Sequence, residues 1–213
     1  MLSEISNIHL KEVIRLKTKK YREETGLSLA EGWRLLRQLA DNGIEFAELF
    51  ISDEDSSRLE KLRYQKIFKL RDWQMAKICD SVTPQNIAAV IRNDLTPITN
   101  QNFLLYLDRI NDPGNLGTLL RTAAAAAVSG VVLSPGSCEI FNPKVVRASL
   151  GACCFLPLAI HDPDWLRQQK ARIVVSDVHG TTDLPDFQLP EGNIILVLGS
   201  EAHGVDPQIL EKA

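Results

Sequence analysis

Short apolar runs alternate with stretches of helical spacing along the second half of the 213-residue chain. Such runs, bounded by turn residues, are typical of buried strands, whereas apolar positions three and four apart indicate amphipathic helices. We expect strands over 103–107, 130–133, 155–160, 172–177 and 193–198. The predicted helices cover 116–128, 143–150, 164–169 and a stretch that begins at Pro207. This alternation predicts a mainly parallel α/β sheet covered on both faces.

The first half alternates less regularly. Strands are expected over 27–30, 46–51, 67–70 and 87–91. Helices are expected over 8–16, 31–42, 56–62 and 72–78. Together they form an α/β module that is long enough to bury a core of its own. The polar stretch 93–102, which contains Pro97, is typical of a linker. We therefore expect one domain at 1–93, a linker at 94–102 and a second domain at 103–213.

Composition narrows the class of protein. The apolar fraction is 45%, which is ordinary for a globular protein, and no apolar run reaches the length of a membrane span. The N-terminus lacks the apolar core of a signal peptide, so a cytoplasmic location is expected. The four cysteines show neither a C-x-x-C pair nor histidines at zinc spacing, so we predict reduced thiols and no metal site.

The net charge of −3 is unevenly distributed. Residues 1–95 hold 16 Lys and Arg against 15 Asp and Glu, giving +1, whereas residues 96–213 hold 8 against 12, giving −4. Within 11–22, six cations stand against the single acid Glu12. Such a cluster suits the phosphate backbone of RNA. The alternative is a solvated basic helix end, which is the commoner explanation of a charge run.

The stretch 103–121 joins a predicted strand, a turn and a helix. Asn115 is a suitable N-cap for this helix, and Arg121 falls one turn beyond Gly117, so its guanidinium is expected over that glycine. An amide and an arginine would then gather at the open end of a helix, where α/β folds bind ligands and anions are favoured. The alternative is an ordinary strand, turn and helix with Arg121 as a surface charge.

Three ordered stretches resemble the SpoU-type RNA 2′-O-ribose methyltransferases of the SPOUT (TrmH-like) class. They are DPGNLGT (112–118) followed by Arg121-Thr122-Ala123, FNPKVVRASLGA (141–152) and LVLGSEAHGV (196–205). Three stretches in the expected order are far more specific than any one alone. The N-terminal module resembles the RNA-binding domain of the same enzymes, a ribosomal-protein-like α/β fold.

The resemblance implies methyl transfer from S-adenosyl-methionine (AdoMet) to a ribose 2′-hydroxyl of RNA, without a metal. It implies rRNA as the first choice of substrate, with tRNA as an alternative, and a homodimer whose C-terminal segment threads a knot. The third sequence block of the family, which forms that knot, is not found before Ala213. We expect a segment beyond Ala213 to carry it, because the three matched stretches keep every expected residue. The alternative is a truncated protein, which would not thread the knot and would bind AdoMet poorly.

The matched positions carry roles implied by the resemblance. Catalytic roles fall on Arg121, Asn115 and Glu201. AdoMet would be bound by Leu198, Gly199, Ser200 and Gly204, with Val178 and Gly180 toward the adenosine. RNA would be bound by Lys17, Lys19, Lys20 and Arg22 of the basic cluster and by Lys144 and Arg147. Simpler roles remain open, namely helix capping for Asn115 and favourable placement at a helix start for Glu201.

Two other functions compete with this interpretation. A non-catalytic RNA-binding protein derived from the same fold predicts RNA binding without AdoMet binding. A dinucleotide-binding oxidoreductase is disfavoured, because 112–117 has the wrong glycine spacing for the G-x-G-x-x-G motif of such enzymes.

Overall fold

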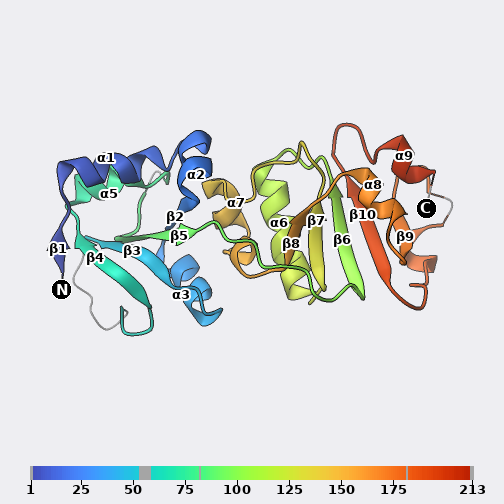
Figure 1. Ribbon diagram of the computed structural model, residues 1–213, viewed down its shortest axis with the longest axis horizontal. Helices are drawn as coiled ribbons and strands as arrows, with labels where there is room; N and C mark the ends of the chain where they lie inside the picture. Colours follow the sequence, from blue (N-terminus) through green and yellow to red (C-terminus); the bar gives the residue numbers. More distant parts are fainter. Residues whose placement is uncertain (1, 53–58, 82, 181, 212–213) are drawn as a thin grey trace. The chain divides into compact units, whose positions relative to one another are not determined.

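The structure, a computed structural model, describes residues 2–52, 59–81, 83–180 and 182–211. These residues form two compact units, each with its own five-stranded sheet (Figure 1). Unit 1 contains Met1–Asp94 and Ile140–Phe155, and unit 2 contains Leu95–Glu139 and Leu156–Ala213. A part of the second half of the chain therefore folds with the first half.

Unit 1 is built on a mixed sheet in the order β1-β4-β3-β5-β2. β3 runs parallel to β4, whereas β5 runs antiparallel to both β3 and β2. The strands are β1 (Ser3–Glu4), β2 (Leu27–Glu31), β3 (Phe46–Ile51), β4 (Tyr64–Lys69) and β5 (Ile87–Arg92). The helices are α1 (Asn7–Arg15), α2 (Lys19–Thr25), α3 (Trp33–Asp41), α5 (Asp72–Ile78), α7 (Pro143–Ala148) and the 3-10 turn η1 (Ala152–Cys154).

Amphipathic helices bury the apolar positions of this sheet. α1 and α5 pack together, and their side chains Leu10, Val13 and Met75 join Phe50 of β3 in one core cluster. α3 buries Leu35, Leu36 and Leu39 and contacts β2 and β5. The helical spacing of these leucines is the pattern that predicted the helix.

Residues 140–155 pack against β2 of unit 1. Ser28 of β2 donates a hydrogen bond of 3.2 Å to the carbonyl of Phe141. Arg147 of α7 forms an ion pair with Glu31 at the end of β2. The sequence placed this segment in the second domain, but by its packing it is part of unit 1.

Unit 2 is built on a fully parallel sheet in the order β8-β7-β6-β10-β9. The strands are β6 (Phe103–Asp108), β7 (Gly130–Leu133), β8 (Leu158–Ile160), β9 (Arg172–Ser176) and β10 (Ile194–Gly199). The helices are α6 (Pro113–Ala125), α8 (Pro163–Arg167), α9 (Pro207–Leu210) and the 3-10 turn η2 (Leu184–Asp186). α8 and α9 bury Leu166 and Ile209 against Tyr106 and Val197 on one face, and α6 lies on the other (Figure 1). The predicted parallel α/β sheet is confirmed.

Element boundaries differ from the prediction in several places. α6 begins at Pro113 rather than at residue 116, because the side chain of Asp112 accepts a hydrogen bond from the backbone N–H of Asn115 and caps the helix. The strand expected over 155–160 is limited to Leu158–Ile160, since η1 and the turn after it precede it. The predicted helix over 56–62 begins outside the described residues.

The strand order of unit 2 creates a crevice between β6 and β10. From β6 the chain moves through α6 to β7 and β8, whereas β10 and β9 lie on the other side of β6. The chain after β6 leads to α6 on one face of the sheet, and the chain after β10 leads to α9 on the opposite face (Figure 1). Open α/β sheets bind ligands at such a switch point, beyond the carboxyl ends of the strands.

Candidate active site

An open pocket of about 360 Å³ lies at this crevice. It is lined by the start of α6 and by the ends of the three neighbouring strands and the loops that follow them: Ile110, Asn115, Thr118, Leu119, Ser176, Leu198, Gly199 and Glu201. The register brings these ends together, because Gly199 pairs with Asp108 and Leu198 pairs with Ser176. The volume is at the lower end of the range for small-molecule sites.

Asn115 and Glu201 meet at this pocket. Asn115 lies in the first turn of α6, where its backbone N–H is held by Asp112 at 2.8 Å. Its side-chain amide donates a hydrogen bond to Glu201 Oε1. The sequence suggested Asn115 as the N-cap of the helix, but Asp112 performs that role, and the amide of Asn115 holds Glu201 instead.

A tight loop after β10 carries Glu201. The Ser200 N–H donates to the Gly204 carbonyl at 3.2 Å, and the Gly204 N–H donates to the Ser200 carbonyl at 2.9 Å. The loop folds back so closely that a Cβ on Gly199 would lie 2.2 Å from the carbonyl carbon of Gly204. Because only glycine fits at position 199, the backbone of this turn can approach a ligand closely.

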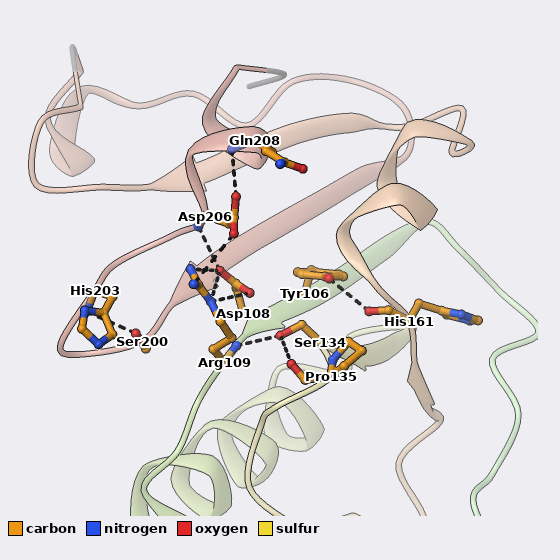
Figure 2. Close-up of polar contacts among 10 residues, drawn as sticks. All are labelled: Tyr106, Asp108, Arg109, Ser134, Pro135, His161, Ser200, His203, Asp206 and Gln208. Carbon is orange, nitrogen blue, oxygen red and sulfur yellow. Dashed lines mark hydrogen bonds and ion pairs between the residues drawn. The ribbon is translucent and has the colours of Figure 1, made fainter.

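A buried carboxylate fastens the end of this loop (Figure 2). Asp108, which is 1% exposed, pairs within the sheet with Gly199 at the start of the loop. Its Oδ2 accepts a hydrogen bond of 2.9 Å from the backbone N–H of Asp206 at the end of the loop. Asp206 then caps α9 by accepting a bond of 2.9 Å from the Gln208 N–H. The loop that carries Glu201 is therefore attached to Asp108 by strand pairing at its start and by the carboxylate at its end.

Arg109 neutralises Asp108 (Figure 2). Its Nη2 donates to Asp108 Oδ2 at 2.9 Å, and its Nη1 lies 3.8 Å from Asp206 Oδ2. Its backbone has φ of 54°, uncommon for a residue other than glycine, and its N–H donates to Ser134 Oγ at 2.8 Å. The hydrogen bond to Asp108 raises the pKa of Arg109, so the ion pair persists at any physiological pH.

Other predicted site residues do not line the pocket. Arg121 is exposed on α6, one turn beyond Thr118, and is not among the lining residues. Val178 is 93% exposed and Gly180 is exposed as well, and neither lines the pocket. Of that predicted region, the pocket reaches Ser176 at the end of β9.

Two of the predicted RNA-binding cations are used by the fold. Arg22 is 3% exposed, and its Nη1 donates to the carbonyls of Leu16 and Lys17, each at 2.8 Å. A guanidinium held in this way links α1 to α2 and offers little surface to a phosphate. Lys17 forms an ion pair of 3.1 Å with Asp80.

The remaining predicted RNA-binding cations are exposed. Lys19 and Lys20 lie on α2, 3.6 Å from Glu23 and 3.8 Å from Glu24 respectively. Lys144 is exposed at the start of α7, and Arg147 is exposed beside Glu31. The two lysine pairs on α2 are exposed on both sides, and such pairs contribute little stability, so a phosphate can replace the carboxylate there at small cost. Glu31, the partner of Arg147, is largely buried.

A buried thiol lies beside Glu31. The Glu31 carboxylate accepts a hydrogen bond of 3.0 Å from the backbone N–H of Asp80. Burial, and next the negative charge of Glu31, raise the pKa of the adjacent Cys79 thiol to about 12. Such a thiol stays protonated and is a poor nucleophile or metal ligand. The described residues include all four cysteines, and none forms a disulfide.

The described residues contain no cluster of three side chains suited to a metal ion. No helix in the described ranges is long and apolar enough to cross a membrane.

Unit 2 therefore has the fold of a parallel α/β protein, with a small-molecule pocket at the switch point of the sheet. Comparison with known proteins identifies the family of the chain. Residues 102–213 match the SpoU rRNA Methylase family, and residues 7–89 match the MRM3-like substrate binding domain. The 23S rRNA (guanosine(2553)-2′-O)-methyltransferase RlmP of Bacillus subtilis is 31% identical over 97% of this chain and 84% of its own length. The mitochondrial rRNA methyltransferase 3 of Xenopus laevis is 37% identical over 73% of this chain, but the match spans only 40% of that protein.

Solved structures agree. The AdoMet-bound rRNA methyltransferase of Sinorhizobium meliloti superposes with a TM-score of 0.84 and 25% identity, covering 100% of this chain and 86% of that one. The chain belongs to the SpoU rRNA methylase family. The predicted family and fold class are confirmed, and with them the enzyme class, an AdoMet-dependent RNA ribose methyltransferase.

The sequence missed several residues of the site. Asp108, Arg109 and Asp206 carry charges, yet nothing in their spacing shows that they form one network. Ile110, Thr118 and Leu119 line the pocket as part of the turn and helix already singled out. The signal for Thr118 and Leu119 was available, because they lie one turn along α6 from Asn115.

Proposed function

We propose that this protein transfers the methyl group of AdoMet to a ribose 2′-hydroxyl of rRNA. Family membership and the rRNA methyltransferases among its relatives support this proposal. The observation that carries it is the pocket between β6 and β10, where the Asn115–Glu201 pair and the glycine turn at residue 199 meet. We expect unit 1, which contains the match to the substrate binding domain, to select the nucleotide that is methylated.

The pocket residues fit AdoMet. Leu198 and Gly199 line the pocket, and with Ser200 and Gly204 of the adjoining loop they would hold the cofactor through backbone groups, since Gly199 leaves no side chain in the way. The end of β9 at Ser176 would place the adenosine side near Val178 and Gly180. AdoMet supplies an activated methyl group on a sulfonium, so the protein needs neither a metal nor a redox centre for this reaction.

The residues of the chain would act mainly by positioning and charge. Arg121 cannot accept a proton while it is ionised, because a guanidinium has no free acceptor. Its role is to bind an RNA phosphate and to stabilise the negative charge that develops on the 2′-oxygen. Asn115 and Glu201 hold each other and so order the start of α6 and the loop after β10 around the pocket.

We also propose that the protein acts as a homodimer and that Lys19, Lys20, Lys144 and Arg147 contact RNA. Arg121 does not line the pocket of its own chain, so a second copy offers a way to bring it to a bound cofactor. The C-terminal knot remains an expectation from the resemblance. A cytoplasmic location remains an expectation from the sequence of the N-terminus, and cell fractionation would test it.

Methyl transfer from labelled AdoMet to ribosomal RNA tests the function. The full-length gene product should label rRNA, and nuclease digestion should yield a 2′-O-methylated nucleoside. tRNA serves as the alternative substrate in a parallel reaction. No label in either RNA, combined with no AdoMet binding in a calorimeter, would exclude the proposal.

A further inference from the structure

A second basic stretch in unit 1 is more exposed than the first. Residues 61–77 hold six Lys and Arg against the single acid Asp72. All six of these cations are exposed, as are two aromatic residues, Tyr64 and Trp73. In the basic cluster at 11–22, by contrast, Arg22 is buried. Exposed positive charge interleaved with aromatic rings is the surface that single-stranded nucleic acids bind.

A pocket of about 600 Å³ opens within this stretch. It lies at the end of β4 and the start of α5, and its walls include Lys69, Arg71 and Trp73. The indole of Trp73 is 47% exposed, which is high for so large an apolar side chain. The pocket also contains Asn7 and Glu4, which can form hydrogen bonds to a polar ligand.

One contact holds the Trp73 ring, and another fixes the turn that carries it. Lys77 lies one turn further along α5, and its ammonium is 4.8 Å from the centroid of the indole ring. The side chain of Gln74, which is 9% exposed, accepts a hydrogen bond of 2.8 Å from the backbone N–H of Arg71. The turn that carries Arg71 and Trp73 is thereby fixed, so a stacked ligand would order few further groups on binding.

We propose that this pocket binds one unstacked nucleotide of the RNA substrate, with its base against Trp73 and the adjoining phosphates near Lys69 and Arg71. RNA sequences are read mainly where bases are splayed out and stacked on aromatic side chains. The cations supply the phosphate contacts, and Glu4 and Asn7 offer hydrogen bonds to a base edge. This inference rests on the proposed function, since it needs an RNA substrate, and it adds a specific site within the substrate-binding unit.

Fluorescence anisotropy with a labelled single-stranded RNA, and with a duplex of the same length, tests the site on the full chain. Trp73→Ala should weaken binding of the single strand about tenfold, because one stacked base is lost. Trp73→Phe should recover most of that loss, and the duplex should bind nearly equally well to all three proteins. Lys69→Gln with Arg71→Gln should lower the slope of log Kd against log salt by about 1.4 for the single strand.

The matched control is Arg34→Gln with Arg37→Gln, which removes two exposed cations from α3 of the same unit. An equal loss of affinity in this control would show that only net charge matters and would overturn the site. Binding by Trp73→Ala within twofold of the unchanged protein would overturn it as well. AdoMet binding should be the same in every variant, so a failure of the methyltransferase proposal would be visible in the unchanged protein and separable from a failure here.

Discussion

Arg121 carries a permanent positive charge on an exposed turn of α6. If it stabilises the charge on the 2′-oxygen, Arg121→Ala should lower kcat about 10²- to 10³-fold. AdoMet affinity and the melting temperature should stay unchanged, because the side chain is exposed and lies outside the pocket. Arg121→Lys should recover part of the activity, since an ammonium binds phosphate as a point charge. Methyl transfer at saturating RNA and AdoMet measures the effect.

Arg167→Ala is the control for Arg121, because it removes an exposed arginine from α8 of the same unit. It should leave kcat unchanged. Turnover near normal in Arg121→Ala would refute the role assigned to the guanidinium.

Cys79 should make the protein less stable in alkali. Its thiol has a pKa of about 12 in the fold against 9.0 ordinarily, because burial and then Glu31 disfavour the thiolate. Between these values the unfolded chain releases the proton first, so stability is full below pH 9.0 and falls as the pH rises. The expected slope is up to ~1.4 kcal/mol per pH unit.

Urea unfolding between pH 8 and pH 11 measures this slope. Cys79→Ala should lower stability at pH 8 yet flatten the alkaline decline relative to the unchanged protein. Ile78→Val is the control, because it perturbs the same buried region of α5 without removing a titrating group and should keep the steep decline. Parallel profiles for the unchanged protein and Cys79→Ala would contradict the assignment.

Residue identities alone could suggest Asn115 and Glu201, because each stands in a recognisable motif. They could not show that the two touch, since 86 positions separate them. Arg22 shows that a sequence pattern can also suggest a role that the fold does not allow. Six cations within 11–22 indicate an RNA surface, but burial of one guanidinium against two carbonyls depends on how α1 and α2 meet. Charge is visible in a sequence, and solvent exposure is not.

The junction of α1 and α2 is the first element-scale test. Arg22→Gln should destabilise unit 1 by about 1–3 kcal/mol, because a buried guanidinium bond to two carbonyls is lost. Lys19→Gln with Lys20→Gln should change stability by less than about 0.5 kcal/mol, since both side chains are exposed. RNA affinity should fall in this double variant. Urea unfolding and RNA binding, measured on the same preparations, separate the structural from the binding role.

The loop from Gly199 to Asp206 is the second element-scale test. The Asp108 carboxylate binds the end of this loop at the backbone N–H of Asp206, so Asp108→Asn should weaken that attachment and misplace Glu201. The expected loss in kcat/KM is about tenfold, in the range for a misplaced supporting group. If Asp108 acts through Glu201, the double variant Asp108→Asn/Glu201→Gln should be no slower than the slower single variant.

If the loss in kcat/KM of the double variant equals the product of the two single losses, Asp108 acts on catalysis independently of Glu201. Leu104→Ala is the control for simple loss of stability, because Leu104 is buried at the opposite end of the same strand. It should lower unfolding free energy by about 2–5 kcal/mol while leaving kcat/KM at low temperature unchanged.

The sequence predicted the elements of unit 2 well because a buried parallel strand is a nearly continuous apolar run, as in Ile194–Gly199. Ends were less predictable. The start of α6 depends on whether Asp112 or Asn115 caps the helix, and both are good caps by residue type. β1 was missed because two exposed residues, Ser3 and Glu4, join the sheet through backbone bonds alone.

At the scale of the whole molecule, the sequence suggested two consecutive domains, whereas packing joins residues 140–155 to the first unit. The contacts responsible are long-range in sequence, such as the Ser28 hydroxyl on the Phe141 carbonyl and the ion pair between Glu31 and Arg147. No local pattern reveals which unit a segment of mixed polarity will join. The motif at 141–152, one of the three stretches that resemble the family, therefore lies in unit 1.

The proposed homodimer can be tested through two variants that are inactive for different reasons. Gly199→Ala should abolish AdoMet binding, because the new Cβ would overlap backbone atoms of Gly204 and Val205 at 2.2–2.3 Å. Arg121→Ala should bind AdoMet but not transfer methyl. Gly136→Ala is the control for a glycine substitution without steric overlap, since no atom lies within 4 Å of the added Cβ.

Mixing the two inactive variants then distinguishes one subunit from two. If Arg121 serves the pocket of its partner, a mixed dimer has one complete site, made from the Gly199 of one copy and the Arg121 of the other. Random mixing makes half the dimers mixed, so roughly a quarter of normal activity should return after joint refolding. If Arg121 serves its own pocket, every site in the mixture carries one defect and no activity returns. Purification through two different affinity tags, one on each variant, would confirm that mixed dimers formed, and their presence without activity would show that each chain completes its own site.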